Sequence, residues 1–399
     1  MKILFVALAG SEHTTRWISQ VEDQKWQLYL FPSFDTLLVN KNLKSVRYCI
    51  PFWRLYIILD KFKLGDIYRI IYRVFIKFKL FIDNKYYEKR LFNYINKIRP
   101  NIIHSMETQG AGYLVCDVKI NYFDRISKFP IWWHTNWGSD FYIYGRILSH
   151  KERIKNLLSN CDYYSCECKR DVDLASNLGF TNLVLPVYPN SGGIKFDIVD
   201  KLLSSALPTS KRKLIMLKGY QGWAGRSLVG IRALERCAEI LTGYTIIIYS
   251  NPFGEDVYIS SQLFTDTTGI PIIILPENVP HQEILKYHSN ARISIGLSIG
   301  DAISTSLLEA MVMGSFPIQS SSSCTTEWFK DGVTGLVVPP EDPDVIELAI
   351  RKALLNDALV NEAASLNYYK IKDNAEYNYL KNITIESYTT ILSNNHDDL

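Results

Sequence analysis

The sequence lacks any apolar run long enough to cross a membrane. Its 399 residues contain no window of about twenty apolar residues, so we expect no transmembrane helix. Residues 1–10 are apolar only briefly, and no small-residue cleavage site follows them. This N-terminal segment therefore predicts a first buried strand of a parallel sheet rather than a signal peptide.

Cysteine is sparse and irregularly spaced. The seven cysteines form an odd set without a regular framework, which indicates reduced thiols in a cytosol rather than disulfides. Cys161, Cys166 and Cys168 lie close together, but no second pair at finger-like spacing accompanies them. Because Tyr163-Tyr164-Ser165 between them is typical of a buried strand, we expect core residues rather than ligands, and no metal site.

The chain has almost no excess of one charge sign. Its formal net charge is +3, which by itself does not indicate a nucleic-acid partner. Residues 51–100 are the exception, with twelve Lys or Arg against four Asp or Glu. Within residues 52–82 basic and aromatic side chains are interleaved, which suits an anionic membrane surface. A core helix with a solvated basic face explains the pattern equally well. No recognised nucleic-acid motif accompanies it, so we expect no nucleic acid as a partner.

Short apolar runs alternate with helical patterns in two separate series. Strands alternating with helices indicate βαβ units, so we predict an α/β protein with two Rossmann-like, doubly wound domains facing a cleft. The predicted strands are Lys2–Leu8, Trp26–Phe31, Asn101–Ser105, Pro130–His134, Cys161–Ser165 and Asn182–Leu185 in the first series, and Lys213–Leu217, Tyr244–Tyr249, Ile270–Leu275, Ala291–Gly296, Phe316–Ile318 and Gly335–Val338 in the second.

The stretch Pro186–Pro208 is rich in Pro, Gly, Ser and Asn and predicts a linker between the two series. We therefore expect an N-terminal domain over residues 1–190 and a C-terminal domain over residues 191–375. Residues 376–399 would contain a terminal aromatic helix. Its pattern is compatible with a helix that crosses back to the first domain and with one that stays on the second.

A glycine-rich turn over residues 219–226 follows the strand predicted at Lys213–Leu217. Gly219 and the later glycines let the backbone approach a ligand closely, as a phosphate requires. Lys218 and Arg226 flank the turn with two positive charges. The spacing matches neither the dinucleotide-binding glycine motif nor the Walker loop, so a nicotinamide or ATPase function is not indicated. A structural turn with solvated charges would give the same pattern.

Two acidic residues, Asp301 and Glu309, stand eight positions apart around a loop of small residues. The loop would precede a helix and offer backbone N–H groups to an anion. Glu309 lies in the most apolar part of that helix, where a carboxylate is costly unless it is paired or bound to a ligand. The alternative is that Asp301 caps the helix and Glu309 is a surface residue. Anion donors beside carboxylates that accept from hydroxyl groups suit a sugar-nucleotide. The loop residues are Ser304, Thr305 and Ser306.

Polar residues also follow two strands of the first series. Gly10 and His13 come after the first strand, where a glycine lets a substrate approach the edge of the sheet. His134 ends another strand, and Asp140 lies in the loop behind it. These side chains could line the cleft, and they could equally be structural polar groups with satisfied hydrogen bonds.

The sequence resembles the family 4 glycosyltransferases, which have the GT-B fold. Weaker similarities lie at Pro100–His104, Gly138–Asp140 and Lys218-Gly219. The specific part spans residues 300–342 and consists of Gly300-Asp301, Ser306-Leu307-Leu308-Glu309-Ala310-Met311, Gly314–Ile318, Thr326-Glu327-Trp328, Asp331–Pro340 and Asp342.

The resemblance implies roles for individual residues. The Glu-x7-Glu motif of the family corresponds to Asp301-x7-Glu309, so Glu309 would hold the ribose hydroxyls and Asp301 would face hydroxyls of the donor sugar. These two and Arg226 are the residues expected to act in the reaction. The diphosphate and the sugar would be bound by the remaining matched positions, Lys218, Gly219, Gly300, Ser304, Thr305 and Ser306.

Some positions depart from the family pattern. Tyr220 stands where the family usually has an arginine, and Arg226 lies near where it usually has a lysine. Asp301 is shorter by one methylene than the usual glutamate. Trp137 occupies the position before Gly138 at which the family often has a histidine.

The resemblance further implies retaining transfer from a nucleotide-diphospho-sugar to a glycan or lipid-linked acceptor, without a metal or another cofactor. No Asp-x-Asp metal-binding motif stands in a suitable place. The N-terminal domain would bind the acceptor and the C-terminal domain the nucleotide-sugar. The expected role is synthesis of a surface polysaccharide such as lipopolysaccharide, in the cytoplasm and peripheral at the inner face of the cell membrane.

Other functions stay open at this point. One alternative is a protein that binds a nucleotide-sugar without turnover, because Asp replaces the first glutamate of the motif. Another is a GT-B epimerase. A phosphorylase-like enzyme is less favoured, because no cofactor-anchoring lysine is identified in the sequence.

Overall fold

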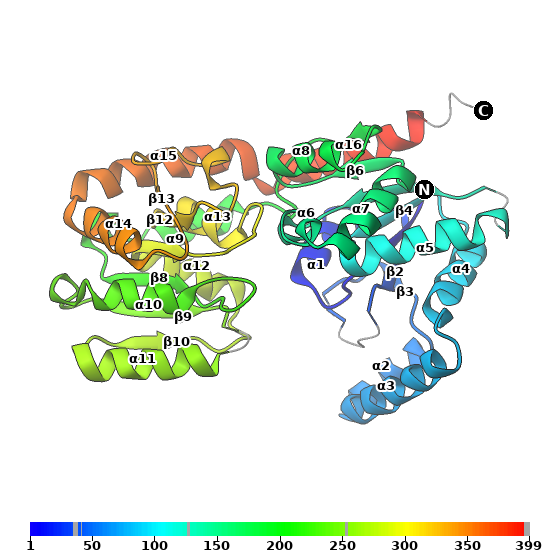
Figure 1. The fold of residues 1–399 in the computed structure, drawn as a ribbon, viewed down its shortest axis with the longest axis horizontal. Helices are drawn as coiled ribbons and strands as arrows, with labels where there is room; N and C mark the ends of the chain where they lie inside the picture. The colour runs from blue at the N-terminus through cyan, green and yellow to red at the C-terminus, as the bar shows by residue number, and fades with distance from the viewer. Residues whose placement is uncertain (35–38, 41, 126–127, 252–253, 395–399) are drawn as a thin grey trace. The chain divides into compact units, whose positions relative to one another are not determined.

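The computed structural model describes residues 1–34, 39–40, 42–125, 128–251 and 254–394. The chain divides into two compact units, Met1–Gly192 together with Lys381–Leu399, and Gly193–Leu380. We call them the N-terminal unit and the C-terminal unit. Each consists of one sheet with helices packed against it (Figure 1).

The N-terminal unit contains a seven-stranded parallel sheet among its described residues, in the order β3-β2-β1-β4-β5-β6-β7. The order runs in one direction from β1 to β3 and in the other from β4 to β7. The switch point between β1 and β4 is where doubly wound sheets bind ligands, outside the carboxyl ends of the strands. The strands are β1 (Lys2–Ala7), β2 (Gln27–Pro32), β3 (Val46–Tyr48), β4 (Ile102–Met106), β5 (Ile131–Thr135), β6 (Tyr163–Ser165) and β7 (Leu183–Val184).

The C-terminal unit repeats this plan with a six-stranded parallel sheet among its described residues, in the order β10-β9-β8-β11-β12-β13. Its switch point lies between β8 and β11. The prediction of two doubly wound α/β sheets is therefore confirmed. The strands are β8 (Leu214–Lys218), β9 (Thr245–Tyr249), β10 (Ile272–Ile274), β11 (Ala291–Gly296), β12 (Phe316–Ser320) and β13 (Leu336–Val338).

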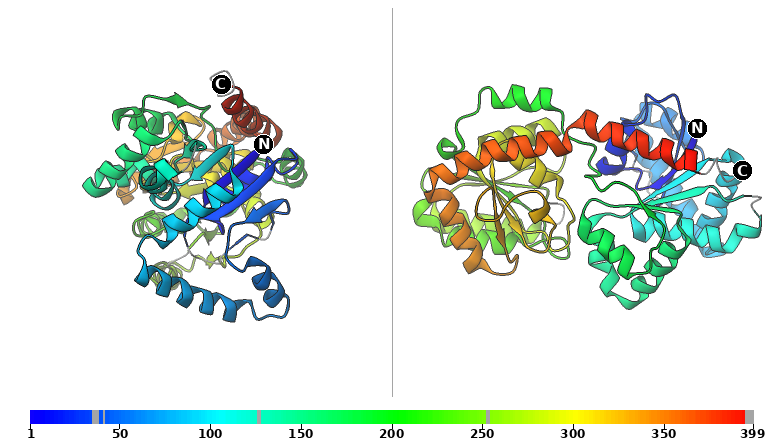
Figure 2. Two further views of the ribbon diagram at one scale, coloured as in Figure 1. Left: turned by 90° about the vertical axis from the view of Figure 1, so that its right-hand side faces the viewer. Right: turned by 90° about the horizontal axis from the view of Figure 1, so that it is seen from above.

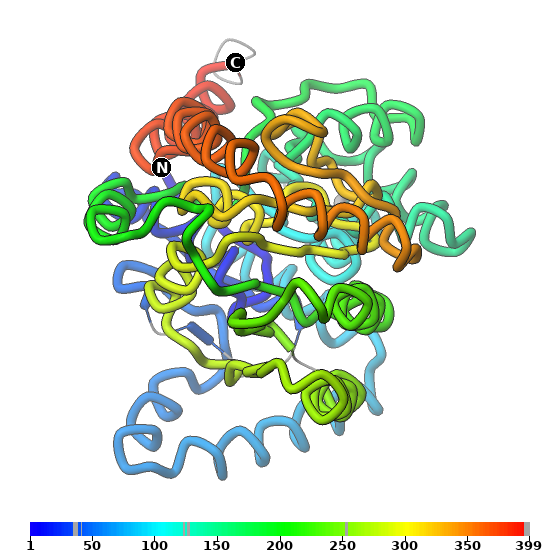
Figure 3. Tube along the Cα trace, turned by 90° about the vertical axis from the view of Figure 1, so that its left-hand side faces the viewer, coloured from blue at the N-terminus to red at the C-terminus, as the bar shows by residue number. Residues whose placement is uncertain are grey.

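Helices cover both sheets. In the C-terminal unit α10 packs between α11 and α14, and the three share one apolar core with the strands (Figure 3). Among the described residues, no helix is both long and apolar enough to cross a bilayer. The helices are α1 (Glu12–Ser19), α2 (Trp53–Lys61), α3 (Gly65–Ile82), α4 (Tyr86–Ile98), α5 (Tyr113–Tyr122), α6 (Gly138–Tyr142), α7 (Leu148–Asn160), α8 (Lys169–Asn177), α9 (Phe196–Leu203), α10 (Ser227–Glu235), α11 (Glu255–Thr268), α12 (His281–Asn290), α13 (Thr305–Val312), α14 (Pro343–Leu355), α15 (Asp357–Ala375) and α16 (Tyr377–Asn394).

Every strand predicted from the sequence is present, most of them with bounds shifted by one or two residues. Strand β3 and helix α9 lie where the sequence analysis expected no element. Strand β3 is only three residues long, which is too short for an alternating pattern to be recognised. The stretch Pro186–Pro208 is not a simple linker, because α9 forms within it. Its apolar residues Phe196, Val199 and Leu203 carry the helical spacing that the surrounding Pro, Gly and Ser residues obscured.

Helix α16 is anchored in the N-terminal unit by Tyr388. The hydroxyl of this fully buried tyrosine accepts a hydrogen bond from Trp17 Nε1 at 3.0 Å and lies 2.6 Å from His104 Nδ1. The His104 ring stacks on Trp133 with ring centroids 4.1 Å apart. These contacts explain why the chain from Lys381 onward is grouped with residues 1–192.

Candidate functional site

The switch point of the C-terminal sheet brings together residues from two separate sequence motifs. Strand β8 ends at Lys218, and the loop that leaves β11 carries Asp301 and Ser304. Lys218 Nζ lies 3.4 Å from Asp301 Oδ2 and donates a hydrogen bond to Ser304 Oγ at 2.9 Å. Since β8 and β11 are neighbouring strands, their carboxyl ends necessarily lie side by side.

Lys218 is a buried cation, with only 8% of its surface exposed. Burial by itself would lower the pKa of its ammonium group, but the charge of Asp301 and the neighbouring Tyr220 and Tyr249 raise the pKa above its ordinary value. The ammonium group is therefore charged at neutral pH. A charged lysine held against the end of a strand suits recognition of a phosphate as a point charge.

The loop of small residues forms the start of α13. Ser304 is the N-cap residue of this helix, and its hydroxyl lies 2.8 Å from Ser306 Oγ. Backbone N–H groups in the first turn of a helix point out along the axis, and the helix dipole adds a partial positive charge there. Thr305 begins the helix itself. The Lys218 ammonium group and the N-terminus of α13 thus place two sources of positive charge at one edge of the sheet.

Glu309 lies one turn further along α13 and is buried. Its Oε1 is 2.6 Å from Nε2 of His281, the first residue of α12. The alternative that Glu309 is a surface residue is therefore wrong. Asp301 does not cap α13, because Ser304 occupies the N-cap position, and Asp301 instead pairs with Lys218.

Two histidines of α12 belong to this region and were missed in the sequence. His288 is fully buried and lies 3.0 Å from Ser294 Oγ through its Nδ1. Burial lowers the pKa of His288 to about 4, although Glu309 acts in the opposite direction. His288 is therefore neutral at pH 7. The spacing His281-x6-His288, two helical turns, is the signal that could have indicated one face of a helix turned toward the same neighbours.

The glycine-rich turn is bonded to the loop that follows β11. Arg226 N donates to Leu297 O at 3.0 Å, and Ile299 N donates to Ala224 O at 3.3 Å. Gly219 is required by packing, because a Cβ there would lie 2.9 Å from the Cβ of Asn251. The structure thus brings the two predicted motifs, residues 219–226 and residues 300–309, into one region. Gly300 is buried just before Asp301.

Arg226 has a different environment from the one its predicted role would need. Its Nε lies 2.5 Å from Glu341 Oε1, and its Nη1 donates to the carbonyl oxygens of Gly222 and Gly225. The guanidinium group thus closes the glycine-rich turn on itself and ties it to Glu341. In the structure as it stands, Lys218 rather than Arg226 is the cation that meets Asp301.

In the N-terminal unit, His134 and Asp140 lie inside the packed core. The two ring nitrogens of His134 are 2.9 Å from Ser105 Oγ and 3.1 Å from Thr108 Oγ1. Burial lowers the pKa of His134 to about 3, so its ring is neutral at pH 7. Asp140 accepts hydrogen bonds from the backbone N–H groups of Thr108 at 2.9 Å and Trp137 at 2.8 Å.

The acidity of Asp140 is strongly altered. Burial, reinforced by the nearby Glu107, raises the pKa of Asp140 to about 8. Glu107 itself is buried, has a φ of 77°, and accepts hydrogen bonds from the N–H groups of Gly110 and Ala111. Burial also raises the pKa of Glu107. This glutamate follows β4 directly, and the sequence analysis did not single it out.

Gly10 and His13 lie on the surface behind β1. Ser11, between them, caps α1 by accepting a hydrogen bond from His13 N at 3.2 Å. The His13 ring lies over Trp137 with ring centroids 5.5 Å apart. The exposed part of this edge therefore carries an aromatic pair and the carboxylate of Glu12, whereas Asp140 and Glu107 are buried.

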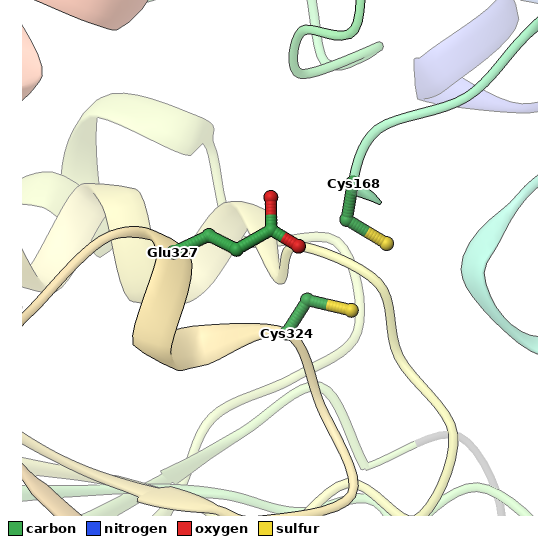
Figure 4. Close-up of side chains that lie close together, drawn as sticks. All are labelled: Cys168, Cys324 and Glu327. Atoms are coloured by element: carbon green, nitrogen blue, oxygen red, sulfur yellow. The ribbon is translucent and has the colours of Figure 1, made fainter. Parts of the chain in front are cut away.

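The cysteines are buried in both units, as expected for core residues. Cys168 belongs to the N-terminal unit and precedes α8. In the C-terminal unit, Cys324 precedes the short turn Thr325–Glu327, and Figure 4 shows its side chain together with that of Glu327.

Comparison with known proteins shows which family model and which solved structures the chain resembles. Residues 268–373 match the family model described as glycosyl transferases group 1. No match was found among curated protein sequences. Three solved structures resemble nearly the whole chain: sucrose-phosphate synthase from Thermosynechococcus elongatus (14% identity, 98% of this chain and 99% of that chain, TM-score 0.69), Anabaena HepE in complex with UDP-glucose (14%, 98% and 100%, 0.65) and a glycosyltransferase from Rickettsia africae (15%, 98% and 99%, 0.61).

These findings agree with the fold and with the residues at the switch point. The two sheets have the architecture of the GT-B glycosyltransferases, and residues 268–373 are similar to the glycosyl transferases group 1 model. The resemblance predicted from the sequence is therefore confirmed for the GT-B fold and for residues 268–373. The narrower assignment to family 4 stays a prediction.

Proposed function

We propose that the protein is a retaining, metal-independent glycosyltransferase that moves a sugar from a nucleotide-diphospho-sugar to a glycan or lipid-linked acceptor. The observation that carries this proposal is the group formed by Lys218, Asp301 and Ser304 at the switch point of the C-terminal sheet, with Glu309 one turn along α13. A cation and a helix N-terminus suit a diphosphate. Carboxylates suit the hydroxyl groups of ribose and sugar.

The residues of the site would divide the donor between them. Glu309 would accept hydrogen bonds from the ribose hydroxyls, in exchange for its present contact with His281. Asp301 would accept from hydroxyls of the donor sugar. Lys218, Gly219, Gly300 and the N–H groups at Ser304, Thr305 and Ser306 would surround the diphosphate. Arg226 would act on the diphosphate only after leaving Glu341.

In the proposed reaction the acceptor hydroxyl attacks the anomeric carbon from the side on which the diphosphate departs. The bond between that carbon and the phosphate oxygen breaks, the new glycosidic bond forms on the same side, and an oxygen of the leaving phosphate takes the proton. Lys218 stabilises the negative charge that develops on the diphosphate, which is the task that a metal ion performs in other transferases. No protein nucleophile is required.

The acceptor would bind at the N-terminal unit, where Gly10, His13 and Trp137 present an exposed edge behind β1. His134 and Asp140 would hold that edge in shape from inside. We further propose a role in surface polysaccharide synthesis, in the cytoplasm and at the inner face of the cell membrane. Because the HepE structure is a complex with UDP-glucose, UDP-sugars are the first donors to test.

The decisive experiment is Glu309→Gln, which keeps the size of the side chain and removes its charge. Glutamine keeps one oxygen that can accept from a ribose hydroxyl, and a hydrogen bond to a charged group contributes about 1.5–3 kcal/mol, so losing one charged contact should weaken the donor roughly 10- to 100-fold. Release of nucleoside diphosphate and formation of the glycoside would be measured with purified protein, UDP- and GDP-sugars and a panel of glycan acceptors.

The matched control is Glu362→Gln on α15, an exposed glutamate outside the site. It should behave as the unaltered protein. If Glu309→Gln transfers sugar at an undiminished rate, Glu309 does not hold the donor. Donor binding without any transfer would favour a binding protein, and a changed sugar without transfer would favour an epimerase.

A further inference from the structure

Helices α2 and α3 form a hairpin at the margin of the N-terminal unit, away from its sheet (Figures 1 and 2). Residues 62–64 join the two helices, and Gly65 permits their close approach, because a Cβ there would lie 2.5 Å from Asp60 Oδ1. We call residues 52–82 the hairpin. It has its own small cluster of buried residues, formed by Ile50, Tyr56, Tyr68, Tyr72 and Ile76.

The face of the hairpin that packs inward is largely made of tyrosine. Tyr68 lies between Tyr56 and Tyr72, with ring centroids 5.7 Å and 6.2 Å away. Arg69 donates to the hydroxyl of Tyr56 at 2.8 Å. On α3 the buried positions Tyr68, Tyr72 and Ile76 are four residues apart, which places them on one side of the helix.

The outward face carries the aliphatic and phenylalanine side chains. Val74 is 64% exposed and Phe81 88% exposed. This arrangement inverts the usual preference, in which isoleucine, valine and phenylalanine are buried more often than tyrosine. The interpretation as a core helix with a solvated basic face is therefore incomplete, because the solvated side carries apolar side chains beside the basic ones. The exposed apolar residues are Phe52, Leu55, Ile57, Ile58, Phe62, Leu64, Ile67, Ile70, Ile71, Val74, Phe75, Phe78, Leu80, Phe81 and Ile82.

A row of basic residues borders this apolar face. Arg69, Arg73 and Lys77 are spaced four residues apart on α3, so they form one stripe between the buried and the exposed apolar sides. Residues 52–82 hold seven Lys or Arg against two Asp. An apolar face bordered by basic side chains is the pattern of a helix that lies in the interface of a bilayer.

We propose that the hairpin docks the protein on an anionic lipid bilayer, with the exposed face of α3 immersed and Arg73 and Lys77 at the level of the lipid headgroups. Charge complementarity selects this occupant. A second copy of the chain would bring two basic stripes toward each other, whereas anionic headgroups neutralise one stripe. The hairpin would lie on the bilayer rather than cross it, because its tyrosine face is already packed against the protein.

The test is flotation of the purified full-length protein with vesicles of phosphatidylcholine and phosphatidylglycerol, and with phosphatidylcholine alone. We expect binding to the anionic vesicles, weakened by salt. The triple variant Ile70→Ser, Val74→Ser, Phe78→Ser should bind more than about 100-fold more weakly, since three large apolar groups are no longer removed from water. The double variant Arg73→Gln, Lys77→Gln should lose roughly 25-fold, at about fivefold for each charge.

Matched controls are Leu348→Ser with Leu355→Ser, exposed on α14, and Lys151→Gln with Lys211→Gln, exposed elsewhere. Both pairs should bind like the unaltered protein. The proposal is overturned if the unaltered protein fails to float with anionic vesicles. It is equally overturned if sedimentation shows a dimer that the triple variant dissociates while vesicle binding is absent. Vesicle binding needs no donor sugar, so this result is independent of the proposed reaction.

Discussion

The switch points of the two sheets hold polar groups of different kinds. In the N-terminal unit, the buried side chains of His134, Asp140 and Glu107 form hydrogen bonds with backbone N–H groups and hydroxyls of the same unit. In the C-terminal unit, Lys218 and Asp301 pair across two loops, and a quarter of the Asp301 side chain is exposed. Groups bonded to backbone inside a core hold the fold, whereas a charge pair that reaches solvent is available to a ligand.

This difference has a consequence for substitutions. A change at the N-terminal switch point should alter stability and leave donor affinity almost intact. A change at the C-terminal switch point should alter donor affinity and leave stability almost intact. Each of the following experiments would sharpen or break that contrast.

The largest effect is expected from Lys218→Met, which keeps the length of the side chain and removes its charge. Truncating one member of a buried charge pair costs about 2–5 kcal/mol of binding, so affinity for a nucleoside diphosphate should fall about 30-fold or more. The Tm should change little, because the exposed part of Asp301 can be solvated. Calorimetric titration with UDP, GDP and ADP would measure the affinity.

Lys211→Met is the control, since this lysine is exposed in the same unit. Affinity should not change in this variant. If Lys218→Met instead lowers the Tm and leaves the affinity unchanged, the Lys218–Asp301 pair is structural, and the contrast between the two switch points disappears.

The fold could be predicted well from the sequence, because a buried parallel strand consists of a short continuous run of apolar residues. The strand Ala291–Gly296 was placed with its observed bounds, since every residue in it is buried. Strand β3 and helix α9 were not found, because one is too short and the other is flanked by residues typical of loops. Local patterns thus predict elements that are long and continuous.

The site was only partly predictable, because its contacts join distant residues. Lys218 and Asp301 were each selected, but their pairing spans 83 positions. Arg226 was expected near the diphosphate, and its pairing with Glu341 spans 115 positions. His281 was missed because one histidine at the start of a helix carries no signal until Glu309 is seen beside it.

The hairpin shows the same limit. Its basic and aromatic residues were found from composition, but the sequence did not show which side of α3 packs inward. The tyrosines could occupy that side because their hydroxyls have polar partners there, such as Arg69 at Tyr56 and Arg90 at Tyr72.

A second and smaller effect is expected from Asp140→Asn. It concerns how the stability of the protein depends on pH. The pKa of Asp140 is raised to about 8 in the folded protein, against roughly 3.9 when unfolded. The folded state therefore binds more protons in this range, and its stability falls as pH rises from about 4 to 8. Asparagine cannot ionise, so the variant should not show this loss.

The measured quantity is the difference in Tm between Asp140→Asn and the unaltered protein. It should grow in favour of the variant between pH 5 and pH 8, by several degrees, since about 1 kcal/mol corresponds to roughly 2–4 °C in units of this size. Affinity for nucleoside diphosphates should stay constant. A difference that does not depend on pH would mean that Asp140 is already ionised in the fold, and loss of donor affinity would show that it is not merely structural.

The smallest and most selective effect is expected from Asp301→Glu, which gives this side chain the length of the glutamate that is usual in the family 4 motif. Asp301 would face the donor sugar, whereas Lys218 and Glu309 would hold the diphosphate and the ribose. The added methylene should therefore leave the affinity for nucleoside diphosphates within about threefold. Selection between two donor sugars, measured as the ratio of their kcat/KM values, should change about tenfold, because one methylene is worth roughly 1–3 kcal/mol in a fitted site.

The matched control is Asp256→Glu on α11, which is exposed. If diphosphate affinity and sugar selection fall together, Asp301 acts mainly by holding Lys218, and the two carboxylates of the motif do not have separate tasks.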